Sequence, residues 1–412
     1  MSIKYYYVSD TNNNKSRAYV RETKKIFELT QLSNPNTYIT KVISPNNQQL
    51  ESNIKYDPKK LQLIKTYKLF DVDTIKYLIN KGANFQFNND YFFRLACSYG
   101  CLDIVKLLID CGSDVKAANN DAIKSTIRYG YLEIVKLLIN SGVDNLIDTI
   151  GIASEHGHDN VVKFLIEQGA DFTDNDNYAI CIAASNNHLS TIKLLISAGA
   201  DITIDNNFSL RIASRFGYID IVKLLVNLGA DITAMNNYSI RKASRNGYLD
   251  IVKLLISLGA DVTAENNFSI RKASRNGYLD IVKLLISLGA DIAAKNNYSI
   301  RKASINGYLD IVKLLISLGA DVTAKNNYAL RKAYRFCHKD IVQLLIDNGA
   351  NISVKNNQIL RRAAIRGDKY MIQLLINNNV DITVDNNCAI KIASENNQTN
   401  IIKLLLEHGA TL

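Results

Sequence analysis

A glycine that recurs every 30 residues from Gly199 to Gly349 constrains the fold of this chain more than any other feature. A fixed period of this size is typical of stacked supersecondary units, because each unit must bury its apolar face against its neighbours. Before Gly199 and after Gly349, other glycines occupy the same position in the repeat, and Asn379 occupies it once. The sequence therefore predicts twelve repeat ends between Asp57 and Leu412. The glycines are Gly82, Gly112, Gly142, Gly169, Gly199, Gly229, Gly259, Gly289, Gly319, Gly349 and Gly409.

The repeat from Asp231 to Ala260 predicts two antiparallel helices. Its last third carries apolar residues at i, i+3, i+4 and i+7, widened by two more, so this helix must be covered on two sides. A shorter helix over 239–246 precedes it, and Gly247 permits a tight reversal between the two. The polar segment 231–237 is expected to project as a turn. Helices this short are marginal alone, so stacking is required.

These residues resemble a known family, the ankyrin repeats. The resemblance is carried by G-A-D at the repeat boundary, by a small residue and glycine between the helices, and by D-I-V-K-L-L-I-S-L-G-A in the second helix. The family's T-P-L-H-x-A signature stands here as Tyr238–Ala243, with only the leucine-like and alanine positions kept. The resemblance implies an all-α solenoid of about twelve helix pairs. Because this repeat has 30 residues rather than the family's 33, its finger turns are expected to be short.

The chain is rich in asparagine, tyrosine and lysine and has a short repeat. In these respects it is similar to the ankyrin-repeat families of amoeba-infecting giant DNA viruses such as the mimivirus-like ones. This resemblance implies a viral protein that captures a host protein in the host cell cytoplasm.

The N-terminal segment differs in character from the repeats, because all three prolines of the chain fall before residue 60. We expect a boundary near Tyr56, with residues 1–56 forming a small α/β segment of uncertain fold and residues 57–412 forming the ankyrin array. Lys4–Val8 and Thr37–Ser44 have the composition of strands, and Ala18–Leu32 that of a helix.

A capping helix is expected where the array begins. Asp57 suits a helix N-cap and Pro58 a first helical residue, so Lys59–Tyr67 is predicted to be the helix of an atypical terminal repeat.

Cysteine usage and hydropathy indicate an intracellular protein that is not secreted. The sequence has no signal peptide and no apolar run long enough to span a membrane. Its six cysteines are scattered, and Cys97 and Cys101 lack further ligands at metal-binding spacing, so they are interpreted as ordinary thiols.

Motifs that would indicate an enzyme are missing from the sequence. There is no G-x-S-x-G, phosphate-binding loop, H-E-x-x-H or dinucleotide fingerprint. We therefore predict a non-enzymatic monomer with no cofactor and no metal.

The candidate binding residues come from the charge pattern. Residues 201–350 hold 20 lysines and arginines against 13 acidic residues, a balance of +7 within a chain whose net charge is +10. In ankyrin arrays the first helices line a concave groove, so the resemblance places there a ladder of arginines that each follow an alanine by two residues. Ile305 interrupts this ladder. The predicted partner-binding residues are the ladder Arg215, Arg245, Arg275 and Arg335, with the aromatic anchors Phe216, Tyr334 and Phe336.

Three interpretations of the basic stripe stay open. In the first, a protein scaffold binds an acidic protein surface or peptide in the groove. In the second, the stripe binds nucleic acid or an anionic surface non-specifically, as a pI near 9.1 allows, although few aromatic residues alternate with it. In the third, recent duplication copied a solvated basic face. The asparagine pairs that precede each first helix, such as Asn236 and Asn237, are interpreted as turn and capping residues rather than contact residues.

Overall fold

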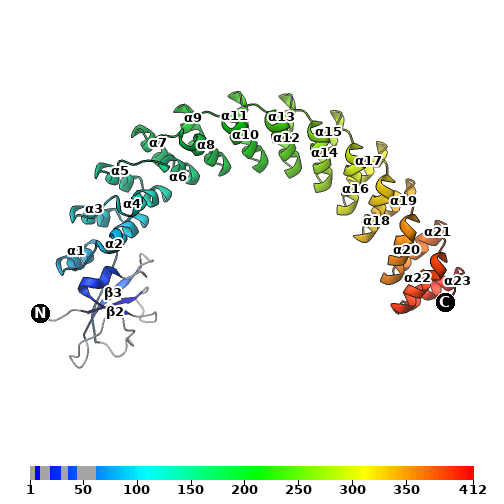
Figure 1. Ribbon diagram of the computed structural model, residues 1–412, viewed down its shortest axis with the longest axis horizontal. Helices are drawn as coiled ribbons and strands as arrows, with labels where there is room; N and C mark the ends of the chain where they lie inside the picture. Colours follow the sequence, from blue (N-terminus) through cyan, green and yellow to red (C-terminus); the bar gives the residue numbers. More distant parts are fainter. Residues whose placement is uncertain (1–4, 10–18, 29–35, 44–61) are drawn as a thin grey trace. The chain divides into compact units, whose positions relative to one another are not determined.

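The computed structural model describes residues 5–9, 19–28, 36–43 and 62–412. The chain forms two compact bodies (Figure 1). We call Met1–Asp205 the N-terminal body and Asn206–Leu412 the C-terminal body.

A four-stranded antiparallel sheet opens the N-terminal body. Its order is β2-β1-β3-β4. Its elements are β1 (Tyr5–Ser9), β2 (Tyr19–Glu22), the 3₁₀ helix η1 (Thr23–Glu28), β3 (Tyr38–Ile43) and β4 (Gln62–Lys68). The strands predicted over 4–8 and 37–44 are confirmed where the structure describes them, whereas Lys4 and Ser44 lie outside the described residues.

Two predicted helices are wrong. Within 18–32, the described part is β2 followed by η1, and residues 18 and 29–32 lie outside the described residues. Within 59–67, residues 62–67 belong to β4, while 59–61 are not described. The second prediction failed because β4 pairs with β3, a long-range contact that local capping residues do not indicate. The hydroxyls of Thr40 and Thr66 share a 2.8 Å hydrogen bond across these two strands.

The sheet packs against the start of the helical array. The ring of Phe27 lies 4.5 Å from that of Phe92 on α2 (Phe87–Ser98). The Tyr6 hydroxyl donates to the Tyr77 hydroxyl on α1 (Val72–Asn80) at 3.1 Å. Both phenylalanines and Tyr6 are buried. The sheet therefore covers the apolar face that a terminal capping helix was expected to cover.

Helices fill the rest of both bodies. In the N-terminal body they are α1 (Val72–Asn80), α2 (Phe87–Ser98), α3 (Leu102–Asp110), α4 (Ala117–Arg128), α5 (Leu132–Asn140), α6 (Thr149–His156), α7 (Asp159–Glu167), α8 (Asp174–Ser185) and α9 (Leu189–Ser197).

The C-terminal body continues the same alternation. Its helices are α10 (Ile204–Phe216), α11 (Ile219–Asn227), α12 (Ala234–Asn246), α13 (Leu249–Ser257), α14 (Ala264–Asn276), α15 (Leu279–Ser287), α16 (Ala294–Asn306), α17 (Leu309–Ser317), α18 (Ala324–Arg335), α19 (Lys339–Asp347), α20 (Val354–Arg366), α21 (Lys369–Asn377), α22 (Val384–Glu395) and α23 (Thr399–Glu407).

Each repeat is a helix pair whose two members line up in separate rows. Among the described residues there are eleven pairs, from α2 and α3 to α22 and α23, and α1 follows β4 instead of a helix. First helices such as α12, α14 and α16 form one row and second helices such as α13, α15 and α17 the other (Figure 1). The predicted all-α repeat solenoid is confirmed.

Side chains from both rows meet in the core between them. On the second helix α13, Ile251, Val252 and Leu255 are buried. Ile240 and Ala243 are fully buried on the first helix α12, which packs against α13. The wide apolar stripe of the second helix predicted that this helix is covered on two sides. It packs against neighbouring second helices in its own row and against the row of first helices.

A glycine reverses the chain between the helices of most pairs. Gly247 has a φ of 90°, and a Cβ built there would lie 2.5 Å from the ring of Tyr278 in the next repeat. Glycine is thus required for backbone conformation and for close packing between repeats. Cys337 takes this place in a later repeat with a φ of 65°, and the His338 N–H still donates to the Ala333 carbonyl at 3.0 Å.

Replacing Gly247 with alanine should therefore cost more stability than replacing Gly259, which has a similar φ of 92° but open space around its Cβ position. Backbone strain alone should cost about 1–2 kcal/mol at either site. Contact with Tyr278 should add about 1 kcal/mol at Gly247. Denaturant unfolding of the full chain measures both, and Tyr278→Ala should remove the difference. Equal costs for the two variants would contradict this packing role.

A basic and aromatic face on the first helices

The main chain makes an unusual turn where most of the first helices begin. In α12, Met235, Asn236 and Asn237 have φ values of 53°, 55° and 59° in succession, so three consecutive residues are left-handed. Such residues cost free energy unless they are glycine or are held by local contacts, and asparagine is among the residues that tolerate the conformation best. The predicted turn role of the asparagine pairs is confirmed, and the turn is left-handed.

The second asparagine of several pairs joins neighbouring repeats. The Asn237 Oδ1 atom accepts a hydrogen bond of 2.8 Å from the main-chain N–H of Asp261, which starts the next repeat. The same bond occurs at five other places in the C-terminal body, with the pairs Asn207 and Asp231, Asn267 and Asp291, Asn297 and Asp321, Asn327 and Asn351, and Asn387 and Thr411. The recorded bonds of these side-chain oxygens go to the next repeat rather than to the N-terminus of their own helix.

An arginine in the same helix holds this turn from the other side. The Arg241 Nε and Nη2 groups donate to the carbonyl oxygens of Asn236 and Met235, both at 2.8 Å. The planar guanidinium suits two carbonyls that point the same way, which an ammonium group cannot match. Equivalent Nε bonds are made by Arg211, Arg271, Arg301 and Arg331 to the carbonyls of Asn206, Asn266, Asn296 and Asn326. We call these five residues the clamp arginines.

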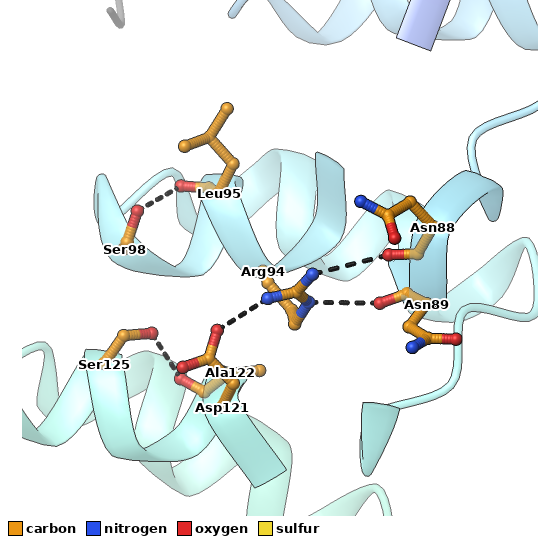
Figure 2. A network of polar contacts seen from close by, with 8 residues as sticks. All are labelled: Asn88, Asn89, Arg94, Leu95, Ser98, Asp121, Ala122 and Ser125. Atoms are coloured by element: carbon orange, nitrogen blue, oxygen red, sulfur yellow. Dashed lines mark hydrogen bonds and ion pairs between the residues drawn. The ribbon is translucent and has the colours of Figure 1, made fainter. Parts of the chain in front are cut away.

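The N-terminal body contains the same clamp with an acidic partner. In Figure 2 the Arg94 side chain reaches the carbonyls of Asn88 and Asn89 and also the carboxylate of Asp121. The Arg94 Nη1 atom lies 2.8 Å from the Asp121 Oδ2 atom. Asp121 lies on α4, in the repeat after Arg94. The charge of this clamp is therefore neutralised by the neighbouring repeat.

Aromatic rings take the place of that carboxylate in the C-terminal body. The Arg241 guanidinium lies 5.8 Å from the ring centroid of Tyr238 and 5.3 Å from that of Phe268 in the next repeat. Rings and clamp arginines thus alternate along the first helices, in a series that we call the aromatic ladder. Its rings are Phe208, Tyr238, Phe268, Tyr298 and Tyr328.

A row of lysines lies over the same rings. The Lys242 ammonium is 4.9 Å from the Tyr238 ring and 5.6 Å from the Phe268 ring. The lysine row consists of Lys242, Lys272, Lys302 and Lys332, one in each of four successive repeats and each partly exposed. Contacts of a cation with a ring face contribute about 0.5–1 kcal/mol at exposed sites, so the rings position these ammonium groups without neutralising them.

The electrostatic environment of this face is strongly positive. Burial lowers the pKa of Lys242, and the positive charges of Arg245, Arg241, Arg215 and Lys272 lower it further. Across the residues that the structure describes, no carboxylate forms an ion pair with any member of the lysine row.

The same positive charges also shift the pKa of Tyr298. Burial raises the pKa of its phenol, but Lys272, Arg275 and Lys302 outweigh burial, so the pKa lies below its ordinary value. Uncompensated positive charge favours an anionic ligand on this face.

The structure places the four arginines of the predicted ladder on the surface of the first helices. Arg215, Arg245, Arg275 and Arg335 are exposed, each at or near the end of its helix. Arg215 lies 5.3 Å from the ring of Phe216, and Arg335 lies 5.8 Å from that of Phe336. These two rings are 43% and 50% exposed.

Tyr334 does not lie on this surface. It is 3% exposed, and its hydroxyl donates to the Asp368 carboxylate at 3.3 Å. Arg366 covers the ring at 5.6 Å. The prediction of Tyr334 as an anchor for a partner is therefore wrong. It occupies a position that is serine in the four repeats directly before it, and a large side chain there extends into the interface with the following repeat.

Sequence reasoning also missed the aromatic ladder. The statement that few aromatic residues alternate with the basic stripe is wrong, because a ring precedes each clamp arginine by three residues and each ring recurs after 30. That spacing places ring and arginine on one side of a helix, which was the available signal.

Comparison with known proteins identifies the repeats. A sequence model described as ankyrin repeats (3 copies) matches residues 64–149, 150–236, 237–296, 270–356 and 330–412. The chain belongs to the ankyrin-repeat family. Ankyrin repeats are general protein-protein interaction modules, and no curated protein matches the chain.

Three further features concern a cysteine thiol, potential metal ligands and membrane-spanning helices. The Cys97 thiol is buried, and burial raises its pKa far above the ordinary value, so it stays protonated. In the described part of the chain no group of three or more His, Cys, Asp or Glu side chains could hold a metal ion. No helix among the described residues is long and apolar enough to cross a membrane.

The clamp arginines should be distinguishable from the exposed arginines by stability. Arg241→Lys keeps the charge but loses the bidentate hold on the turn, so the turn should open about 1 kcal/mol more easily. Arg245→Lys in the same helix should change stability by less than about 0.5 kcal/mol. Amide hydrogen exchange at Asn237, whose N–H donates to the Thr233 carbonyl at 2.8 Å, reports this opening. Similar protection in both variants would argue against the clamp.

Proposed function

We propose that this ankyrin-repeat protein is a non-enzymatic scaffold that binds an acidic segment of a partner protein on the first-helix face of the C-terminal body. The observation that carries the proposal is the lysine row, whose ammonium groups are held in register by the aromatic ladder and have no carboxylate partner among the described residues. An acidic partner would supply the missing negative charge.

The aromatic ladder favours a protein partner over single-stranded nucleic acid. Proteins that bind single strands without sequence preference stack bases on open ring faces. Here the Phe268 ring has Arg241 at 5.3 Å and Arg271 at 5.8 Å, with Lys242 and Lys272 also close. The cations therefore occupy the positions that bases would need.

The exposed arginines extend the same surface. Arg245 follows Lys242 by three residues, and Arg275 follows Lys272 in the same way, so each pair lies on one side of its helix. Phe216 and Phe336 supply exposed apolar area beside Arg215 and Arg335. The similarity in composition to giant-virus ankyrin families supports a host protein inside the host cell as the partner.

Reversing the charge of the exposed arginines should abolish partner capture. We expect a variant with Arg215, Arg245, Arg275 and Arg335 all changed to glutamate to lose a defined protein that wild type captures from a cell lysate. Desolvated charge pairs at an interface each contribute about 1.5 kcal/mol or more, so four reversals exceed a hundredfold loss. Circular dichroism first establishes that the variant is folded.

A matched control lies on the second helices. Lys223, Lys253, Lys283 and Lys313 are exposed on α11, α13, α15 and α17, and changing them to glutamate alters net charge by the same amount. This control should retain the partner. Identical capture by wild type and the arginine variant would make the exposed arginines a solvated part of the face, and equal losses in both variants would indicate a net-charge effect.

A further inference from the structure

The spacing of the lysine row restricts the shape of the segment that it can bind. Arg241 lies between the rings of Tyr238 and Phe268, at 5.8 and 5.3 Å from their centroids. Successive rings are therefore at most about 11 Å apart, which agrees with the 8–10 Å that separates packed helices. Because each lysine is held over its own ring, neighbouring ammonium groups repeat at roughly 10 Å.

We infer that the lysine row binds an extended polyproline II segment of a partner protein that carries an acidic residue at every third position. A polyproline II helix rises about 3.1 Å per residue with three residues per turn. Every third side chain therefore lies on one side of it, at a spacing of about 9.3 Å. This spacing matches the row within the reach of a lysine side chain. The inference rests on the proposed function and adds the conformation and spacing of the ligand.

A β-strand does not match this row. Its side chains alternate between two faces, so residues on one face repeat at about 6.6 Å or at multiples of that distance. Carboxylates at that spacing lose register with ammonium groups at roughly 10 Å after one or two repeats.

Acidic residues on an α-helix could match the spacing of the lysine row, but the main chain of a helix could not accept hydrogen bonds from the arginines beside the row. Seven helical residues span about 10.5 Å, so an acid at every seventh position would also meet each lysine. However, Arg245 and Arg275 lie beside Lys242 and Lys272 as further donors. The carbonyl groups of an α-helix are bonded within the helix, whereas those of polyproline II have no internal partners and accept from such arginines.

The proteins to compare are the full-length chain and four folded variants. Lys272→Gln and Lys302→Gln remove central members of the row, one in each variant. Lys283→Gln and Lys313→Gln remove exposed lysines from the second helices α15 and α17 and serve as matched controls.

Binding of synthetic peptides, measured by fluorescence anisotropy, tests the inference. The first probe carries four glutamates, one at every third position, with proline between them. The second has the same composition with its glutamates in one block. A third has glutamate at every seventh position of an alanine-rich helix, and a single-stranded oligothymidine provides the nucleic-acid arm.

We expect the spaced peptide to bind about tenfold more tightly than the block peptide, because it engages successive lysines together. Lys272→Gln and Lys302→Gln should each weaken it about threefold, and the second-helix controls should leave it unchanged.

Each other result overturns the inference in a distinguishable way. If the spaced and block peptides bind equally and both need Lys272 and Lys302, the spacing rule fails while the first-helix face remains the docking surface. Tighter binding of the helical peptide replaces the extended segment with a helix. If no peptide binds, if the second-helix controls matter as much, or if the oligonucleotide binds most tightly, the proposed function fails together with the inference.

Discussion

The hydrogen bond from the main chain of one repeat to the asparagine of the preceding repeat supports much of this structure. The Asn237 Oδ1 atom accepts from the Asp261 N–H, and Asn237 makes this bond from a left-handed conformation. Three left-handed residues in succession are costly, and Arg241 offsets that cost by binding the carbonyls that the turn exposes. The turn, the arginine and the bond to the next repeat recur together with the 30-residue period from Arg211 to Arg331.

The clamp explains why a basic surface accumulates on the first helices. A clamp arginine binds the turn in five successive repeats, so positive charge is added with each of these copies. The turns of α4 and α22 form with Lys124 and Lys391 at the same position. In the N-terminal body Asp121 neutralises Arg94 from the neighbouring repeat. In the C-terminal body a tyrosine or phenylalanine occupies that place beside the clamp arginines Arg211, Arg241, Arg271 and Arg301. A ring holds a guanidinium without cancelling its charge. Exchanging a carboxylate for a ring thus turns a structural device into a positively charged face.

This division separates two roles within one basic stripe. The clamp arginines are committed to carbonyl groups and rings, and two of them, Arg301 and Arg331, are buried. The lysine row and the exposed arginines have no such commitment to the turn. The row is also continuous across four repeats, while the arginine ladder is broken at Ile305. A ligand that follows the stack therefore finds its regular contacts on the lysines.

The sequence by itself determined the repeat, the two helices in it, the reversal glycines and the excess of positive charge on the first helices. These features depend on local spacing and on apolar periodicity, which are written along the chain. Only the tertiary structure decided which cations are available, because Arg241 and Arg245 have the same charge and differ in what surrounds them. It also buried Tyr334 against Asp368 and paired β4 with β3 where capping residues predicted a helix. In each case the outcome depends on a contact with another repeat or strand, which no local pattern specifies.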